Sequence, residues 1–187
     1  VRLEGLIATS GKHPLAHEKN KTLDEYEKML REGLKEIASR FIGKPIWIRS
    51  SDIRSDEYSN LEGAPKEIEK NPMLGYHGIR FSLKHDGIFR AELRAIKALC
   101  DDGHKFGVMF PQIISIDEVR AAKKIFEEEG CGEKVQFGVM VETPAASWLI
   151  KDICEEKIDF ISFGTNDLTQ YTLAIDRGNE DVQYLFD

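Results

Sequence analysis

The sequence is poor in cysteine and has no long apolar run. Its three cysteines, Cys100, Cys131 and Cys154, form neither a close pair nor a CxxC motif. This argues against a disulfide framework or a zinc site and favours reduced thiols in the cytoplasm. No apolar run approaches the roughly 20 residues that a membrane-spanning helix requires, and no basic-then-apolar leader opens the chain. We therefore expect a soluble cytoplasmic protein with no membrane partner.

The sequence has fewer basic than acidic residues, and it has no initiator methionine. With 26 Lys and Arg against 33 Asp and Glu, the net charge is −7, which argues against broad nucleic-acid binding. The 187 residues are 41% hydrophobic, enough for one sizeable core. Because the chain begins at Val1 inside an apolar run, we expect residues 1–187 to be a piece of a larger protein.

Apolar runs alternate with helical patterns along the whole chain, and this predicts the α/β class. No glycine-rich phosphate loop follows the first run, and polar residues end several of the runs, so a β/α barrel is favoured over a doubly wound sheet. A closed barrel needs eight strands, so about five strands predict an incomplete (β/α)8 TIM-type barrel. The five strands are expected at residues 1–7, 45–49, 105–110, 135–142 and 159–164.

Helix-start signals support these boundaries. Residues 22–25 and residues 115–118 have the spacing of a capping box, and each precedes an apolar helical pattern. Pro144 stands where the first turn of a helix is expected. The segment 50–71 is too long for a simple connector, which is typical of a functional loop.

Two of the expected strands deliver a carboxylate directly at their ends. Glu142 follows the run 137–141, and Asn166 and Asp167 follow the run 160–164. A charge at the edge of an apolar core is costly without a partner, so two neighbouring acids suggest a shared cation. We predict Glu142 and Asp167 as Mg²⁺ ligands. Helix capping is the structural alternative for both acids.

Arginines are expected at the same edge. Arg2 and Arg49 lie near the ends of the first two predicted strands, and Arg177 lies just beyond the last helix. Arginine binds phosphate and carboxylate through a rigid fork of donors, whereas Mg²⁺ prefers one or two carboxylates plus substrate oxygens. A phosphorylated carboxylic acid suits both elements.

Several motifs, in order, resemble one family. The motifs are NPMLG at 71–75, VETPA at 141–145, GTNDLTQ at 164–170 and DR at 176–177. They are similar to the C-terminal phosphoenolpyruvate/pyruvate-binding barrel of the phosphoenolpyruvate-utilising enzymes. This family includes phosphoenolpyruvate synthase (pyruvate, water dikinase), pyruvate phosphate dikinase and enzyme I of the sugar phosphotransferase system. The segments 11–14, 48–52 and 57–61 are most similar to the synthase, whereas 164–171 is closer to enzyme I.

The resemblance implies roles for the predicted residues. Arg2 and Arg49, assisted by Asn166, would hold the transferred phosphoryl group, and Arg177 would hold the carboxylate of pyruvate or phosphoenolpyruvate. The two strand-end acids would bind Mg²⁺. In the family pattern Leu-Gly-x-Arg-Gly-x-Arg, Arg80 matches the second arginine and would also bind substrate. His77 stands in place of the first, which leaves the contribution of this corner open.

The resemblance also implies what lies elsewhere. The family's catalytic cysteine would follow Asp187, and none of the three cysteines here has a matching motif, so no catalytic residue is assigned. Residues 1–187 would be a single partial barrel domain, inactive alone, working with phosphohistidine and ATP-binding domains of an intact chain that is expected to form a homodimer. The intact enzyme would convert ATP, pyruvate and water to AMP, phosphoenolpyruvate and phosphate. A Mg²⁺-dependent pyruvate lyase or aldolase, or a noncatalytic dimerisation module, stays open as an alternative.

Overall fold

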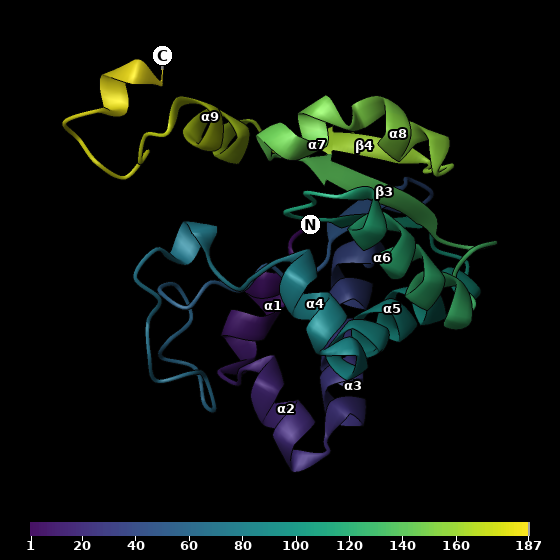
Figure 1. Ribbon diagram of the computed structural model, residues 1–187. Coiled ribbons are helices and arrows are strands. Elements are labelled where there is room, and N and C mark those ends of the chain that lie inside the picture. Colours follow the sequence, from purple (N-terminus) through teal and green to yellow (C-terminus); the bar gives the residue numbers. More distant parts are fainter. Residues whose placement is uncertain (187) are drawn as a thin grey trace.

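The computed structural model describes residues 1–186, and a curled parallel sheet is its centre (Figure 1). The strands lie side by side in chain order, β1-β2-β3-β4, and every pair is parallel. Parallel strands that follow one another in sequence order and are joined by helices form the wall of a barrel. The α/β class and the incomplete barrel are therefore confirmed. The strands are β1 (Ile46–Arg49), β2 (Phe106–Phe110), β3 (Gln136–Val141) and β4 (Phe160–Phe163).

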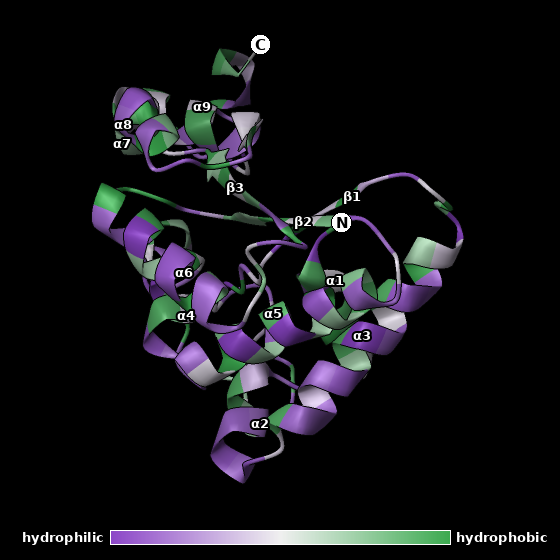
Figure 2. Cartoon of the chain, turned by 90° about the vertical axis from the view of Figure 1, so that its right-hand side faces the viewer, coloured by the Kyte–Doolittle hydropathy of each residue, from purple (hydrophilic) through white to green (hydrophobic). Residues whose placement is uncertain are grey.

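Helices surround this sheet unevenly. Helices α1 to α6 gather on one side of strands β1 to β3, whereas α7, α8 and α9 lie near the end of β3 (Figure 2). In the part of the chain that the structure describes, no helix is long and apolar enough to cross a membrane. The helices are α1 (Leu3–Ser10), α2 (Pro14–Asn20), α3 (Leu23–Ser39), α4 (Ile79–Lys84), α5 (Asp86–Asp101), α6 (Ile116–Glu128), α7 (Pro144–Trp148), α8 (Ile150–Glu155) and α9 (Thr165–Leu173), with the 3-10 turns η1 (Pro72–Leu74) and η2 (Gln183–Leu185).

The strand predicted at residues 1–7 is wrong, because helix α1 begins at Leu3. Leu3 and Ile7 are fully buried one helical turn apart, and a short apolar run of this kind fits a helix as well as a strand. The residues before α1 are held at the sheet by a single parallel bridge between Arg2 and Arg49 and by hydrogen bonds of Val1 to Trp47 and Arg49. The described residues therefore contain four strands and not five, with Arg2 held beside the end of β1.

The main core lies between the sheet and helices α3 and α5. Alternate strand residues such as Ile48, Val108 and Phe137 point into it and are at most 2% exposed. The ring of Phe110 packs between those of Phe89 and Phe137, with centroids 5.4 and 4.8 Å away. This apolar layer holds the strands in register and thereby fixes where their ends point.

The opposite face of the sheet is closed at its amino-terminal end by aromatic rings. Phe160 packs against Trp47 with centroids 6.1 Å apart. It also covers Gly107 and Gly138, where an added Cβ would come within 2.9 and 2.4 Å of the Phe160 ring. The rings take the room that side chains at these glycines would need, so the carboxyl-terminal end of the sheet remains as the open side.

The helix-start predictions have mixed outcomes. At Ser115 both bonds of the capping box with Glu118 are present, and Pro144 occupies the first turn of α7 as predicted. The capping box predicted at residues 22–25 is wrong, because the Thr22 hydroxyl lies 3.1 Å from the ring of His17 and does not cap α3. Segment 50–71 contains no helix or strand, which confirms the predicted long loop.

Candidate functional site

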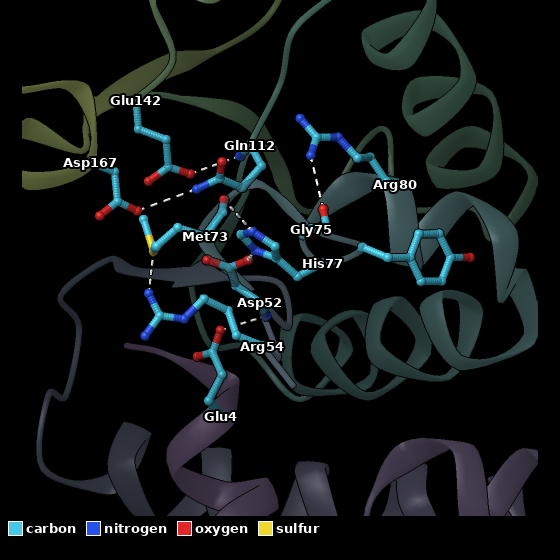
Figure 3. A network of polar contacts seen from close by, with 12 residues as sticks. Glu4, Asp52, Arg54, Met73, Gly75, His77, Arg80, Gln112, Glu142 and Asp167 are labelled. Carbon is cyan, nitrogen blue, oxygen red and sulfur yellow. Dashed lines mark hydrogen bonds and ion pairs between the residues drawn. The ribbon is translucent and has the colours of Figure 1, made fainter. Parts of the chain in front are cut away.

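A cavity of about 330 Å³ opens at the carboxyl ends of the strands. Arg80 does not line it; this residue lies in α4, and its Nη1 donates to the Gly75 carbonyl at 3.0 Å (Figure 3). The other six predicted site residues all line the cavity, namely Arg2, Arg49, Glu142, Asn166, Asp167 and Arg177.

The two acids are brought together by the pairing of β3 with β4. Val141 of β3 lies opposite Phe163 of β4, and Gly164 N donates to Val141 O at 3.0 Å. Strands β3 and β4 therefore end at the same level of the sheet. Glu142 follows immediately, and Asp167 lies in the first turn of α9. A Cβ at Gly164 would lie 2.5 Å from both Cβ and Oε2 of Glu142, so the glycine makes room for this carboxylate.

Glu142 is a buried carboxylate whose ionised form is disfavoured by its surroundings. It is 1% exposed, and its Oε1 accepts a hydrogen bond from the backbone N–H of Gln112 at 2.7 Å. Burial, together with the nearby charges of Asp52 and Asp167, raises the pKa of Glu142 to about 8, although the Gln112 bond and Arg49 oppose this. A group of this kind gains from a bound cation, which would compensate both burial and repulsion.

Gln112 joins the two acids, and the sequence analysis missed it. Its backbone N–H donates to Glu142 Oε1, and its Nε2 donates to Asp167 Oδ2 at 3.3 Å (Figure 3). Its Oε1 lies 3.0 Å from the Tyr171 hydroxyl. It is 1% exposed and has a left-handed backbone with φ 61°, a conformation that costs energy in a residue other than glycine. Its place after β2 and Pro111, at the same edge as Glu142, was the available signal.

Arg49 is held firmly from behind by two other acids that the sequence analysis missed. Nη2 lies 3.0 Å from Glu4 Oε1, and Nη1 lies 3.3 Å from Asp52 Oδ2. Glu4 Oε1 also accepts from the backbone N–H of Asp52 at 2.6 Å. Burial lowers the pKa of Arg49, but the two carboxylates outweigh this and raise it overall, so the guanidinium stays charged. Glu4 lies in the segment that was mistaken for a strand, which explains why its role was missed.

The remaining predicted residues lie at the open rim. Arg177 is 41% exposed and pairs with Asp167 Oδ1 at 3.4 Å from Nη1. Arg2 and Asn166 are exposed. Side chains at a rim can move toward an incoming anion, whereas Arg49 presents a charge that is already in place.

The donor set suits a small hard cation. Residues 1–186 contain no group of three or more histidines, cysteines, aspartates or glutamates placed to hold a metal ion. Mg²⁺ needs fewer protein ligands than that, since it commonly binds one or two carboxylates and completes its shell with water and substrate oxygens. Glu142 and Asp167, held side by side through Gln112, supply two carboxylates of this type. The residues present therefore fit Mg²⁺.

Comparisons with known proteins point to one family. A family model described as "PEP-utilising enzyme, PEP-binding domain" matches residues 1–187. A probable phosphoenolpyruvate synthase of Archaeoglobus fulgidus is 49% identical over 99% of this chain and 25% of its own length. The phosphoenolpyruvate synthase of Pyrococcus furiosus is 43% identical over 100% of the chain and 23% of its own length. A phosphoenolpyruvate-protein phosphotransferase of Latilactobacillus sakei is 43% identical over 83% of the chain and 28% of its own length. The chain thus spans about a quarter of the length of these relatives.

Proposed function

Because the chain belongs to the phosphoenolpyruvate-utilising enzymes, through their phosphoenolpyruvate-binding domain, we propose that its cavity binds phosphoenolpyruvate or pyruvate together with Mg²⁺. One observation carries the proposal. Glu142 and Asp167 lie side by side through Gln112, in a cavity whose wall also includes the half-buried cation Arg49. Paired acids facing a fixed guanidinium suit an anion that is bound partly through a metal ion.

The roles follow from position. Arg49 is anchored by Glu4 and Asp52 before any ligand arrives, so it is the preorganised contact for the phosphoryl group, with Arg2 beside it. Asn166 lies at the rim and can donate to the same group. Arg177 lies at the other side of Asp167 and is placed for the carboxylate of the substrate.

The acids and the arginines share the work of neutralising charge. Mg²⁺, when bound, supplies positive charge next to substrate oxygens. Glu142 and Asp167 hold that charge at the strand ends, and Arg49 and Arg2 balance the phosphoryl oxygens. Phosphoryl transfer has a charge-rich transition state and needs little covalent chemistry from the protein, so positioned cations are the main requirement. Arg80 supports the turn at Gly75, and direct binding of substrate by Arg80 stays a prediction.

For the intact protein we propose the synthase reaction, in which ATP, pyruvate and water become AMP, phosphoenolpyruvate and phosphate. A phosphohistidine carried by another domain would donate the phosphoryl group to the enolate oxygen of pyruvate. Relatives named phosphoenolpyruvate synthase match nearly the whole chain at up to 49% identity, which favours this reaction over that of the protein phosphotransferases. Homodimer formation stays a prediction, which sedimentation analysis of the intact protein tests.

Calorimetry of ligand binding tests the proposal. Oxalate and phosphoenolpyruvate are titrated into the 187-residue chain with Mg²⁺ and with EDTA. The variants are Glu142→Gln and Asp167→Asn, and the matched control is Glu36→Gln, an exposed acid of α3 outside the cavity. We expect Mg²⁺-dependent binding in the wild type and the control, weakened about tenfold or more in the two site variants. Equal affinity in Mg²⁺ and EDTA would refute the magnesium site.

A coupled assay tests the activity of the chain alone. We expect no phosphoenolpyruvate from pyruvate and ATP, because no residue of this chain has been assigned as the proton-transfer group or as the phosphohistidine. Turnover by the isolated chain would contradict this and would point to a catalytic residue within residues 1–187.

A further inference from the structure

His77 is a fully buried residue in the wall of the cavity, just before α4. We propose that His77 is an imidazolium under neutral conditions, and that its charge adds to the positive charge of the cavity and raises the affinity for the anionic substrate. The inference rests on the proposed function for the identity of the anion. The charge of His77 lies outside the strand ends that supply Glu142 and Arg49.

The hydrogen-bond pattern identifies the protonation state. Nδ1 of His77 lies 2.7 Å from Asp52 Oδ1, and Nε2 lies 2.9 Å from the backbone carbonyl of Met73 (Figure 3). A carbonyl only accepts, and so does an ionised carboxylate. Each ring nitrogen must therefore carry a hydrogen. A neutral ring has only one, and it would leave one of the two buried contacts without a donor.

The surroundings keep Asp52 ionised and His77 protonated. Burial raises the pKa of Asp52, but the bond from His77 and the charge of Arg49 outweigh it and lower the pKa overall. Burial likewise lowers the pKa of His77, and its bond to Asp52 and the charge of that carboxylate outweigh it and raise the pKa overall. Two further cations face the pair: Arg80 acts on His77 against protonation, and Arg54 acts on Asp52 in favour of ionisation.

The neighbouring helix α9 adds a hydroxyl contact, and it also carries the acid Asp167 of the cavity lining. The Tyr171 hydroxyl, from α9, donates to the same Met73 carbonyl at 2.6 Å and also lies 3.0 Å from Gln112 Oε1. His77 and Tyr171 thus both bind the Met73 carbonyl, and Tyr171 also contacts Gln112, the residue that joins the two acids. Loss of the His77 proton would loosen this turn as well as remove a charge.

His77 adds one positive charge to the lining of the cavity. The other ionisable side chains of its lining cancel when all are charged, because four arginines face four acids. A protonated His77 therefore leaves the lining net positive by one charge, and a neutral His77 leaves it balanced. The arginines are Arg2, Arg49, Arg54 and Arg177, and the acids are Asp52, Glu57, Glu142 and Asp167.

The sign of the pH effect follows directly. The charge is present below the raised pKa of His77 and is lost as the pH rises through it, so this contribution to affinity falls toward alkaline pH. If the bound anion raises that pKa by about one unit, affinity falls about tenfold across the titration. Arginine at position 77 would keep its charge throughout, whereas glutamine would never have one.

Two measurements test the inference on the 187-residue chain. Nitrogen-15 NMR of the histidine rings reports protonation without any ligand, and the His77 signal among the five histidines is the one missing in His77→Arg. Calorimetry with oxalate and Mg²⁺ is then run from pH 6.5 to about 9 on the wild type, His77→Arg and His77→Gln. Affinities are compared as ratios between two proteins at the same pH, because the titration of the other groups then affects both proteins equally.

We expect both ring nitrogens of His77 to be protonated at pH 7. His77→Arg should bind as tightly as the wild type wherever the ring signals show a charged His77, and about tenfold more tightly wherever they show a neutral one. His77→Gln should bind about tenfold more weakly than the wild type wherever His77 is charged. If His77→Gln does not fold, the ring signals and the arginine variant still decide the question.

A neutral ring at pH 7, or binding by His77→Gln as tight as that of the wild type at a pH where the ring signals show a charged His77, overturns the inference while wild-type binding leaves the proposed function intact. Absence of Mg²⁺-dependent binding in the wild type at every pH refutes the proposed function. It also refutes the role of His77 in binding, even where the ring signals show an imidazolium.

Discussion

Replacing Glu142 by glutamine should stabilise the metal-free chain at alkaline pH, although the same change should impair Mg²⁺ binding. The side chain is 1% exposed, and its pKa is raised by burial, then by Asp52 and Asp167, to about 8. Glutamine keeps the oxygen that accepts from the Gln112 backbone at 2.7 Å and removes only the charge. The carboxylate of Glu142 therefore lowers the stability of the metal-free fold while providing a ligand for a cation.

The magnitude follows from the pKa. An ordinary glutamate of pKa 4.5 loses its proton in the unfolded chain well before Glu142 does at about 8 in the folded chain. Between these values the folded state binds more protons, so wild-type stability falls as pH rises from about 4.5 and levels off above about 8. At about 1.4 kcal/mol per pH unit, the upper bound is roughly 5 kcal/mol. We expect Glu142→Gln to exceed the wild type by about 2–5 kcal/mol at pH 9 and by little at pH 5.

Urea unfolding in EDTA, at several pH values from 5 to 9, measures this difference. Glu92 is also buried, with its pKa raised by burial to about 7, but it titrates in both proteins and so cancels in the comparison. Glu36→Gln is the matched control, since Glu36 is exposed and its replacement should give no pH-dependent difference. Added Mg²⁺ should narrow the gap by stabilising the wild type only.

Two outcomes would refute the reasoning. A stability difference between Glu142→Gln and the wild type that does not grow with pH would mean that Glu142 is ionised at little cost in the folded chain. A less stable variant at pH 9 would mean that the carboxylate already has a compensating partner, such as Arg49, stronger than the burial that opposes it.

Further predictions concern a close contact and a buried hydroxyl. Gly164→Ala places a methyl group 2.5 Å from Glu142 Oε2, so it should cost about 1–3 kcal/mol in urea unfolding and weaken Mg²⁺-dependent oxalate binding in calorimetry. The same methyl in Gly5→Ala meets nothing within 4 Å and should leave binding unchanged; equal binding losses in both would contradict the steric argument. Tyr26→Phe removes the hydroxyl that donates to Glu92 Oε1 at 3.0 Å, so it should destabilise by about 1–3 kcal/mol. Because ionised Glu92 needs this donor most, the loss should be larger at pH 8.5 than at pH 6, and a loss independent of pH would show that Glu92 does not titrate in this range.

Most of the sheet could be predicted because its strands carry their own signals. The apolar runs that became β1 to β4 are short and bounded by turn residues, and the barrel pattern follows from their alternation with helices. Residues 1–7 were predicted wrongly, because the spacing of Leu3 and Ile7 fits one face of a helix as well as one face of a strand. The packing of α1 on α3 decided between them, and no local pattern contains that information.

The residues that line the cavity were easiest to predict at the strand ends. Glu142 and Asp167 were found because parallel strands deliver their ends to one edge. Gln112 was overlooked because a lone glutamine after a proline resembles an ordinary turn. Glu4, Asp52 and the state of His77 depend on contacts across 45, 48 and 25 positions of sequence, which no spacing rule reaches.

The amino-acid order by itself determined the class of fold, the open end of the half-barrel and the residue types that meet there, because hydrophobic periodicity and strand direction are local properties. Only the tertiary structure decided which charges oppose one another. Ionisation of a buried group depends on partners a few ångströms away, so the raised pKa of Glu142, the anchoring of Arg49 and the double hydrogen bonding of His77 exist only once distant segments have packed together.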